Sequence, residues 1–157
     1  MEIADLLAPD AVIASLKAQS KKQLLQEMSE HAAHLTGLPD RRIFETLIER
    51  ERLGSTGMGQ GIAIPHGRIA SLARITGFFA RLDTPIAYDA VDNQPVDLVF
   101  LLLAPEGAGA DHLKALARVS RLLRNQQTCE KLRAANKAEV LYSLLTAPTN
   151  GASSVAA

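Results

Sequence analysis

The 157-residue chain has one cysteine, no excess of either charge and no long apolar run, and each of these absences excludes a class of protein. The single cysteine, Cys129, rules out an internal disulfide. We expect it to be a small buried residue in a protein of a reducing compartment. The 17 basic residues are matched by 17 acidic ones. This balance argues against nucleic acid or an anionic membrane as the main partner, because both need a concentrated basic excess.

The chain also lacks a segment that would target or anchor it. Its N-terminus has neither a basic start nor a long apolar stretch, so we expect no signal peptide. The most apolar run, 96–104, is interrupted by Asp97 and is much shorter than the roughly 20 residues that span a bilayer. We therefore expect a cytoplasmic protein without membrane insertion, with one domain at 5–147 and a disordered tail at 148–157.

Helices are expected in the N-terminal third of the chain. Ser20 and Gln23 have the spacing of a capping box, and Gly37 is placed to end the helix that they start. Asp40 is expected to cap a second helix. The inner face of that second helix is expected to contain Phe44, Leu47 and Ile48.

The C-terminal third is predicted to be helical as well. Asp111 is expected to cap a helix, and two short amphipathic segments follow at 129–135 and 138–145. The apolar residues that this first helix carries are Leu113, Leu116, Ala117, Leu122 and Leu123.

Strands are predicted between these two helical regions. The apolar or β-branched segments are 11–16, 61–64, 75–82 and 96–103. Turn signals at Asp83-Thr84-Pro85 and at 92–95 separate the last two strands. Helices at both ends of the chain and strands between them predict an α/β fold in which helices cover a sheet.

The segment 54–68, GSTGMGQGIAIPHGR, contains the main candidate for catalysis. His66 has a lone pair available near neutral pH, so it could attack phosphorus and form a phosphohistidine. Pro65 stiffens the backbone just before the ring, and Gly67 is expected to let the chain turn away just after it.

A phosphoryl group on this histidine would need hydrogen-bond donors and positive charge. The candidate phosphoryl-binding loop consists of Ser55, Thr56, Gly57 and Gly59, which offer hydroxyls and closely approaching backbone N–H groups. Arg50 could neutralise the charge of the transferring group, although the charged run 49–52 would by default be a solvated helix end. The loop matches neither the dinucleotide fingerprint nor the P-loop.

The other three histidines, His31, His34 and His112, differ in their surroundings. His112 is expected at a helix start, where a neutral imidazole could donate an N–H to a phosphoryl oxygen or to His66. His31 and His34 are three residues apart, but no further ligand accompanies them, so no metal site is expected. Each signal is weak alone, since a lone histidine is more often structural or solvated than catalytic.

Three motifs occur in order along the chain: RERLGSTGMGQGIAIPHGR, DNQPVDLVFLLLAPEG and DHLKALARVSRLL. Together they closely resemble the type-2 enzyme IIA domains of the bacterial phosphotransferase system, the fructose/mannitol class, over about residues 5–147. Within that class the chain looks most like the nitrogen-regulatory IIA proteins. The resemblance implies a single mixed β-sheet flanked by helices on both faces. It also implies that a histidine phosphocarrier protein phosphorylates His66 at Nε2, that Arg50 and His112 assist, and that no cofactor or metal takes part.

Several functions are compatible with this resemblance. The phosphorylation state of the protein could control regulatory partners, for which the resemblance suggests potassium transport proteins or sensor kinases. Alternatively, the protein could be a sugar-specific IIA component that passes phosphate to a IIB protein for sugar uptake. A binding domain without the chemistry is a third possibility, and the combination of His66, Arg50 and His112 argues against it.

Overall fold

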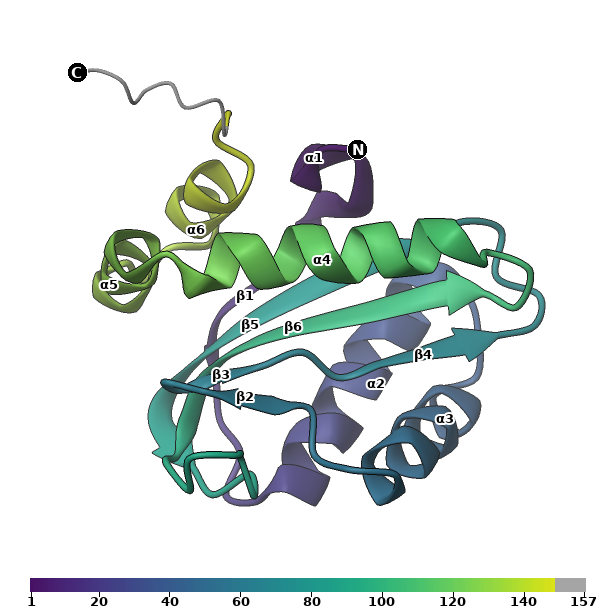
Figure 1. Ribbon diagram of the computed structural model, residues 1–157, viewed down its shortest axis with the longest axis horizontal. Coiled ribbons are helices and arrows are strands. Elements are labelled where there is room, and N and C mark those ends of the chain that lie inside the picture. Colours follow the sequence, from purple (N-terminus) through teal and green to yellow (C-terminus); the bar gives the residue numbers. More distant parts are fainter. Residues whose placement is uncertain (149–157) are drawn as a thin grey trace.

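The strands form one mixed sheet with the order β1-β5-β6-β3-β2, and β4 pairs with β6 as well (Figure 1). The computed structural model describes residues 1–148. The elements in chain order are α1 (Ile3–Leu6), β1 (Leu7–Leu16), α2 (Lys21–Thr36), α3 (Asp40–Arg52), β2 (Gly57–Gly59), β3 (Ile62–Ala63), β4 (His66–Ile69), β5 (Thr76–Ile86), β6 (Val96–Pro105), α4 (Ala110–Arg124), α5 (Gln126–Ala134) and α6 (Ala138–Leu145). The predicted α/β fold with a single mixed sheet is confirmed.

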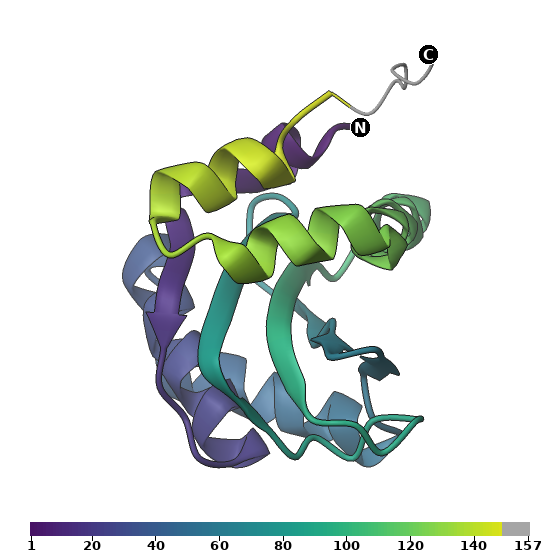
Figure 2. The ribbon, with the colours of Figure 1, turned by 90° about the vertical axis from the view of Figure 1, so that its left-hand side faces the viewer.

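Helices cover both faces of this sheet. One face packs against α2 and α3, and the other lies beneath α1, α4, α5 and α6 (Figure 2). The central strand β6 is buried along almost its whole length, with only Asp97 and Pro105 partly exposed. A strand covered on both faces needs apolar side chains on both, which explains the nearly continuous apolar run.

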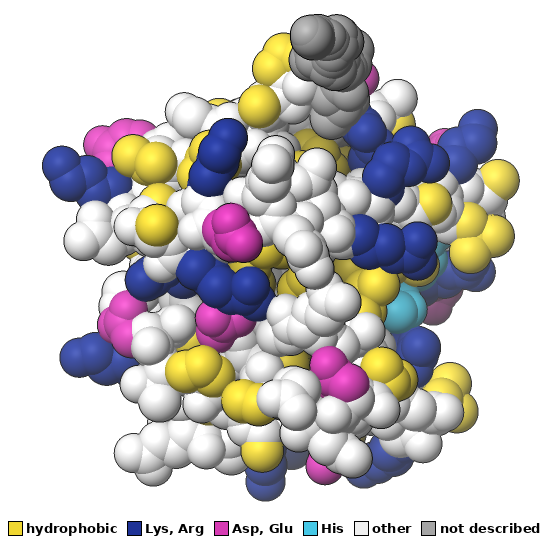
Figure 3. Space-filling model, turned by 60° about the vertical axis from the view of Figure 1, so that its left-hand side comes forward, with side chains coloured by type: hydrophobic (Ala, Val, Ile, Leu, Met, Phe, Trp, Pro, Cys, Tyr) yellow, Lys and Arg dark blue, Asp and Glu magenta, His cyan; other side chains and the backbone are white. Residues whose placement is uncertain are grey.

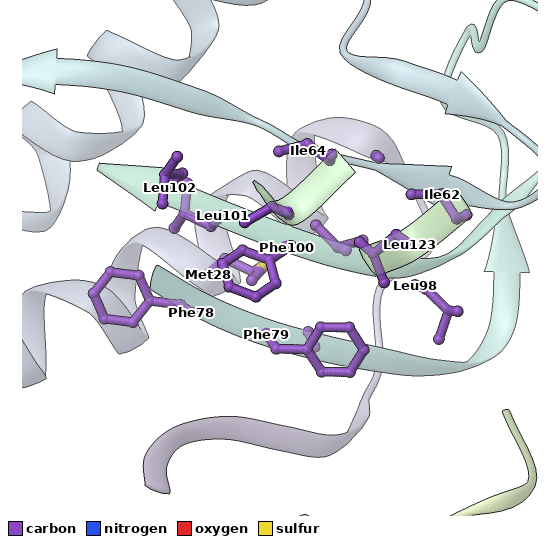
Figure 4. Packing of buried hydrophobic residues seen from close by; sticks show 14 of the residues in the cluster. Met28, Ile62, Ile64, Phe78, Phe79, Leu98, Phe100, Leu101, Leu102 and Leu123 are labelled. Atoms are coloured by element: carbon purple, nitrogen blue, oxygen red, sulfur yellow. The ribbon is translucent and has the colours of Figure 1, made fainter. Parts of the chain in front are cut away.

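The core is built mainly from β5, β6 and the helices that face them (Figure 4). The rings of Phe79 and Phe100 meet edge to face, with 6.3 Å between their centroids. Met28 of α2 packs on one side of the sheet, and Leu123 of α4 packs on the other. Cys129 is 4% exposed and its thiol lies 3.2 Å from the Leu123 carbonyl oxygen, so its prediction as a small buried residue is confirmed.

The strands β3 and β4 follow β6 as one interrupted strand. Ile62 pairs with Leu98, and His66 pairs with Leu102, both in the parallel sense. The interruption falls at Pro65, which has no backbone N–H to donate, although its carbonyl still accepts from the Leu102 N–H at 2.9 Å. This short break is the feature that positions the site described below.

The predicted start of α2 is correct, and the capping box is altered. Ser20 accepts from the backbone N–H of Gln23 at 3.1 Å. The Gln23 side chain, however, accepts from the backbone N–H of Gln19 at 2.7 Å instead of from that of Ser20. Gly37 ends the helix in the left-handed region, with φ of 79°.

The two predicted aspartate caps are wrong. Pro39 occupies the cap position of α3, so Asp40 is already its first helical residue. Gly109 precedes α4, and Asp111 lies inside the first turn, where its charge still suits the helix dipole.

The predicted inner face of α3 is confirmed, and the predicted apolar residues of α4 are partly wrong. In α3 Leu47 is buried, and Phe44 and Ile48 are half-buried and pack against the core. In α4 Leu113 is 66% exposed. The stripe of α4 that the sheet covers consists of His112, Ala115, Val119 and Leu123.

Strand boundaries differ from prediction at several points. The turn expected at Asp83-Thr84-Pro85 is wrong, because β5 continues to Ile86. The pairing register with β6 shifts between Arg81 and Ile86, so Pro85 lies where no ladder bond needs its missing N–H. The short strands β2 and β4 and the helix α1 were not predicted.

The remaining expectations concern the membrane and the tail. Within residues 1–148, no helix combines the length and the apolar character that crossing a bilayer requires. The predicted disordered tail, apart from Pro148, lies outside the described residues.

Candidate functional site

His66 lies at the first position of β4, directly after the break in the strand. Its Nδ1 is 2.8 Å from the carbonyl oxygen of Ile64. A carbonyl oxygen can only accept, so Nδ1 of the neutral ring must carry the proton. Nε2 therefore keeps its lone pair, which makes it the nucleophilic atom of this half-buried side chain.

Close packing of α3 against β4 brings Arg50 to this nitrogen. A Cβ on Gly67 would lie 2.5 Å from the Thr46 methyl group, so only glycine permits this approach. One helical turn beyond Thr46, Nε of Arg50 donates to His66 Nε2 at 3.3 Å, and its Nη1 donates to the Gly54 carbonyl at 2.9 Å. The expected turn at Gly67 is wrong, because this residue continues β4 and serves helix packing.

His112 reaches the same place from α4, on the opposite side of the sheet from α3. Its ring centroid is 5.7 Å from that of His66, with the two planes at 71°. His112 is 6% exposed, so it is a buried residue of the first turn of α4 and not a solvated one. Nδ1 of His112 accepts from Nε of Arg68 at 3.1 Å, while no residue of the described chain bonds its buried Nε2.

The environment favours the neutral form of both rings. Burial is the main cause that lowers the pKa of His66 below its ordinary 6.5; the bond to Ile64 opposes it, Arg50 lowers the pKa further and Glu51 raises it. Burial also lowers the pKa of His112, assisted by the nearby charges of His66 and Arg68. Neutral rings are the forms that can attack phosphorus or donate one N–H.

The loop before β2 is held from within by Glu51. This carboxylate, 6% exposed, accepts from the backbone N–H of Thr56 at 3.0 Å and also from the Thr56 hydroxyl. The Tyr88 hydroxyl donates to it at 3.1 Å, and the ammonium group of Lys21 lies 2.8 Å away. The charged run 49–52 was expected to be solvated, and Glu51 shows that this is wrong for one of its members.

The predicted phosphoryl-binding loop thus already has internal partners. The Ser55 hydroxyl donates to the Tyr88 carbonyl at 3.1 Å and accepts from the Gly57 N–H at 3.0 Å. The hydroxyls of Ser55 and Thr56 therefore hold the loop in shape in this structure. Burial is the main cause that raises the pKa of Tyr88, so its hydroxyl stays a donor in this network.

Exposed apolar side chains lie on the segments that carry the site. Leu53 follows Arg50 by one helical turn, and Leu113 follows His112 directly. Met58 lies in β2, and Val91 donates its N–H to the Gly57 carbonyl at 3.4 Å. Figure 3 shows a histidine side chain among yellow apolar and dark-blue basic side chains on one face of the molecule. We call Leu53, Met58, Val91 and Leu113 the apolar rim.

His31 and His34 of α2 are not part of this site. Nε2 of His31 lies 3.1 Å from the Asp10 carbonyl oxygen, and His34 is exposed. Over residues 1–148 no three potential ligands are grouped so that they could hold a metal ion.

Comparison with known proteins defines the class of this domain. Residues 5–147 match the family described as "Phosphoenolpyruvate-dependent sugar phosphotransferase system, EIIA 2". The chain belongs to this family, as its three sequence motifs predicted.

Within the family, the chain is similar both to nitrogen regulatory proteins and to a sugar-specific component. The chain is 59% identical over 148 residues to a nitrogen regulatory protein of Bradyrhizobium diazoefficiens, covering 94% of this chain and 97% of that protein. The crystal structure of nitrogen regulatory protein IIA-Ntr from Neisseria meningitidis superposes with a TM-score of 0.87 at 38% identity, covering 92% of this chain and 99% of that one. A fructose-specific EIIABC component of Bacillus subtilis is 33% identical over 146 residues, covering 92% of this chain and 23% of that protein.

Proposed function

We propose that the protein is a phosphoryl-accepting histidine protein of a bacterial phosphotransferase system, phosphorylated on His66 by a histidine phosphocarrier protein. One observation carries the proposal: the Ile64 carbonyl holds the Nδ1 proton of His66 and leaves the Nε2 lone pair directed at Arg50. A general surface histidine has no reason to be fixed in this tautomer beside a guanidinium.

The transfer is a single displacement at phosphorus. The Nε2 lone pair of His66 attacks, the P–N bond of the carrier's phosphohistidine breaks, and its electron pair returns to the carrier's imidazole. Positioning and charge stabilisation supply most of the catalysis of such a loose transition state. The positive charge that develops on the ring of His66 is shared with the Ile64 carbonyl through the Nδ1–H bond.

Arg50 and His112 are the groups that would hold the phosphoryl oxygens. When phosphorus binds Nε2, the Arg50 Nε–H loses its present acceptor and becomes available to an oxygen of the new anion. The buried Nε2 of His112, on a ring whose centroid is 5.7 Å from that of His66, would gain a partner by donating its proton to the phosphoryl group.

The loop of Ser55, Thr56, Gly57 and Gly59 would line the remaining side of the phosphoryl group. Its role is to present backbone N–H groups, because the two hydroxyls are bonded within the loop. The set of residues that surrounds His66 needs no metal or cofactor for transfer from a protein phosphohistidine.

The apolar rim is the proposed docking surface for the carrier. Replacing Leu113 with serine should raise the KM for the phosphocarrier several-fold and leave kcat unchanged, since one exposed apolar side chain contributes about 1 kcal/mol to a contact. Val140→Ser on α6 is the matched control, because Val140 is also an exposed apolar residue but lies on an element that carries no site residue. Equal KM values for the two variants would contradict this docking surface.

Regulation is the function that we propose for the phosphorylated and free forms. The 59% identity to a nitrogen regulatory protein over nearly the whole chain supports control of nitrogen- or potassium-related partners, such as potassium transport proteins or sensor kinases. The alternative is a sugar-specific IIA role with transfer to a IIB protein, which the similarity to a fructose-specific EIIABC component supports. Rapid loss of label to a purified IIB protein would favour the alternative. We expect both roles to take place in the cytoplasm.

The central experiment maps the phosphate after incubation with the phosphorylated carrier. The wild-type protein and the His31→Ala control should carry one phosphoryl group on His66, and His66→Ala should carry none. Label of wild-type stoichiometry on His66→Ala would show that the site is elsewhere.

A further inference from the structure

The two facing histidines are held by opposite kinds of partner. Nδ1 of His66 faces a carbonyl oxygen, which can only accept, whereas Nδ1 of His112 faces the Nε–H of Arg68, which can only donate. In their neutral forms the two rings therefore carry opposite tautomers. His66 has its proton on Nδ1 and a lone pair on Nε2, and His112 has a lone pair on Nδ1 and its proton on Nε2.

We propose that Arg68 is a positioning residue that fixes the tautomer of His112 and so turns its Nε2–H toward a phosphoryl group on His66. The inference rests on the proposed function for the identity of the anion. The assignment of the tautomer itself rests only on the contacts of the unphosphorylated protein.

The strand β4 explains how one segment serves both rings. Successive residues of a strand point to opposite faces, so His66 and Arg68 share the face that α4 covers while Gly67 faces α3. The spacing of two residues thus places the nucleophile and the guanidinium side by side beneath His112. The 44-residue separation between Arg68 and His112 is closed only by the packing of α4 on the sheet.

This arrangement also decides which of the two histidines is the nucleophile. His112 has no lone pair facing the site, since its only unprotonated nitrogen is bonded to Arg68. If the proton moved to Nδ1, the lone pair of Nε2 would point at the phosphoryl oxygens and repel them. Loss of the Arg68 donor should therefore turn a donor to the anion into a competing acceptor.

The ¹⁵N chemical shifts of the histidine rings test the proposal in the unphosphorylated protein, at about pH 8 where both rings are neutral. In the wild type, His112 should be protonated on Nε2 and His66 on Nδ1. Arg68→Met removes the donor, so His112 should populate both tautomers while His66 keeps its own. Arg68→Lys retains a donor and a charge and should restore most of the wild-type population.

Transfer from the phosphocarrier gives the functional readout. Arg68→Met should slow phosphorylation of His66 on the order of tenfold, the effect of losing one hydrogen bond to a charged group, and Arg68→Lys should recover most of the rate. The control is Arg74→Met, because Arg74 is also exposed but lies beyond the end of β4; this variant should match the wild type in both measurements.

Two results would overturn the proposal: a wild-type His112 that carries its proton on Nδ1, or an Arg68→Met variant in which His112 remains wholly protonated on Nε2. The first can be measured even if Arg68→Met fails to fold. Failure of the proposed function gives a different result, because the wild-type protein would then show these tautomers and still take no phosphate.

Discussion

Two arginines flank the interrupted strand formed by β3 and β4, and they are held in contrasting ways. Arg133 of α5 forms a bidentate pair with Asp97, with three N–O distances between 2.9 and 3.1 Å, and also donates to the Gln60 carbonyl at 2.8 Å. Arg50 of α3 donates to a neutral imidazole at 3.3 Å and to the Gly54 carbonyl at 2.9 Å. A guanidinium that is neutralised by a carboxylate stabilises the fold. A guanidinium with uncharged acceptors keeps its positive charge available for an anion.

Each arginine lies near a glycine at a position where a Cβ would clash with a neighbouring side chain. A Cβ on Gly61, where φ is +84°, would lie 2.5 Å from Nη2 of Arg133. Near Arg50 the corresponding close contact is between Gly67 and the Thr46 methyl group. Both regions thus depend on a glycine for close packing. The two arginines differ in their acceptors, which are uncharged for Arg50 and a carboxylate for Arg133.

The largest expected effect comes from removing the available charge. Arg50→Gln should slow phosphorylation of His66 by roughly 10²- to 10³-fold, the usual cost of losing one preorganised donor to a developing anion. The free energy of unfolding should change by less than about 1 kcal/mol, because neither acceptor of Arg50 is a buried charge. Single-turnover labelling and chemical denaturation measure the two quantities. Arg52→Gln is the control, since Arg52 is 68% exposed and pairs with exposed Glu49; equal transfer rates for both variants would remove Arg50 from the mechanism.

Glu51 follows Arg50 directly, and its replacement should mainly reduce the free energy of unfolding. Glu51→Ala removes an acceptor shared by Thr56 and Tyr88 and the carboxylate that pairs with Lys21. We expect a loss of about 3 kcal/mol in the free energy of unfolding, within the range for breaking a partly buried charged network. Urea denaturation measures this loss. The control Glu49→Ala, 71% exposed, should cost less than about 0.5 kcal/mol, and similar losses for both variants would show that the network contributes little.

Arg133→Gln completes the comparison with Arg50. This variant should lose about 1–2 kcal/mol of stability, because the pair with Asp97 is partly exposed and therefore partly screened. Its transfer rate should equal that of the wild type. Arg41→Gln, which breaks a largely exposed pair with Glu45, should be nearly neutral in both measurements. A transfer defect in Arg133→Gln as large as that of Arg50→Gln would break the distinction between the two arginines.

The smallest expected effect is a shift in titration. His66 should titrate below 6.5 in NMR, chiefly because it is buried. The unfolded chain then binds the proton more readily, so stability should fall as the pH drops below about 6.5, and this loss should level off below the folded-state pKa. Arg50→Gln should move the pKa upward, and Arg133→Gln should leave it unchanged. A His66 pKa at or above 6.5 in the wild type would contradict the neutral, buried ring.

The sequence predicted the architecture through its long, strongly patterned segments. The start of α2 at Ser20, its end at Gly37 and the apolar strand β6 are local features with local causes. The strands β2 and β4 have no such pattern, because they are short and exist only through pairing with β3 and β6. The extension of β5 through Pro85 was missed for a similar reason, since a shift in the pairing register of β5 with β6 makes the proline tolerable.

Site residues that belong to a sequence motif could be predicted. Site residues that are defined only by a tertiary contact could not. His66, Arg50 and His112 came from residue chemistry and family resemblance, and the structure places them together. Arg68 and the interior position of Glu51 were missed. Their partners are distant side chains, such as Tyr88 for Glu51, and no spacing along the chain signals such a contact.

The most direct test of the account is ¹⁵N–³¹P NMR on the protein phosphorylated by its carrier. The account predicts one phosphorus coupled to Nε2 of His66, with the proton retained on Nδ1 and bonded to Ile64. Coupling to Nδ1 of His66, or to either nitrogen of His112, would contradict it.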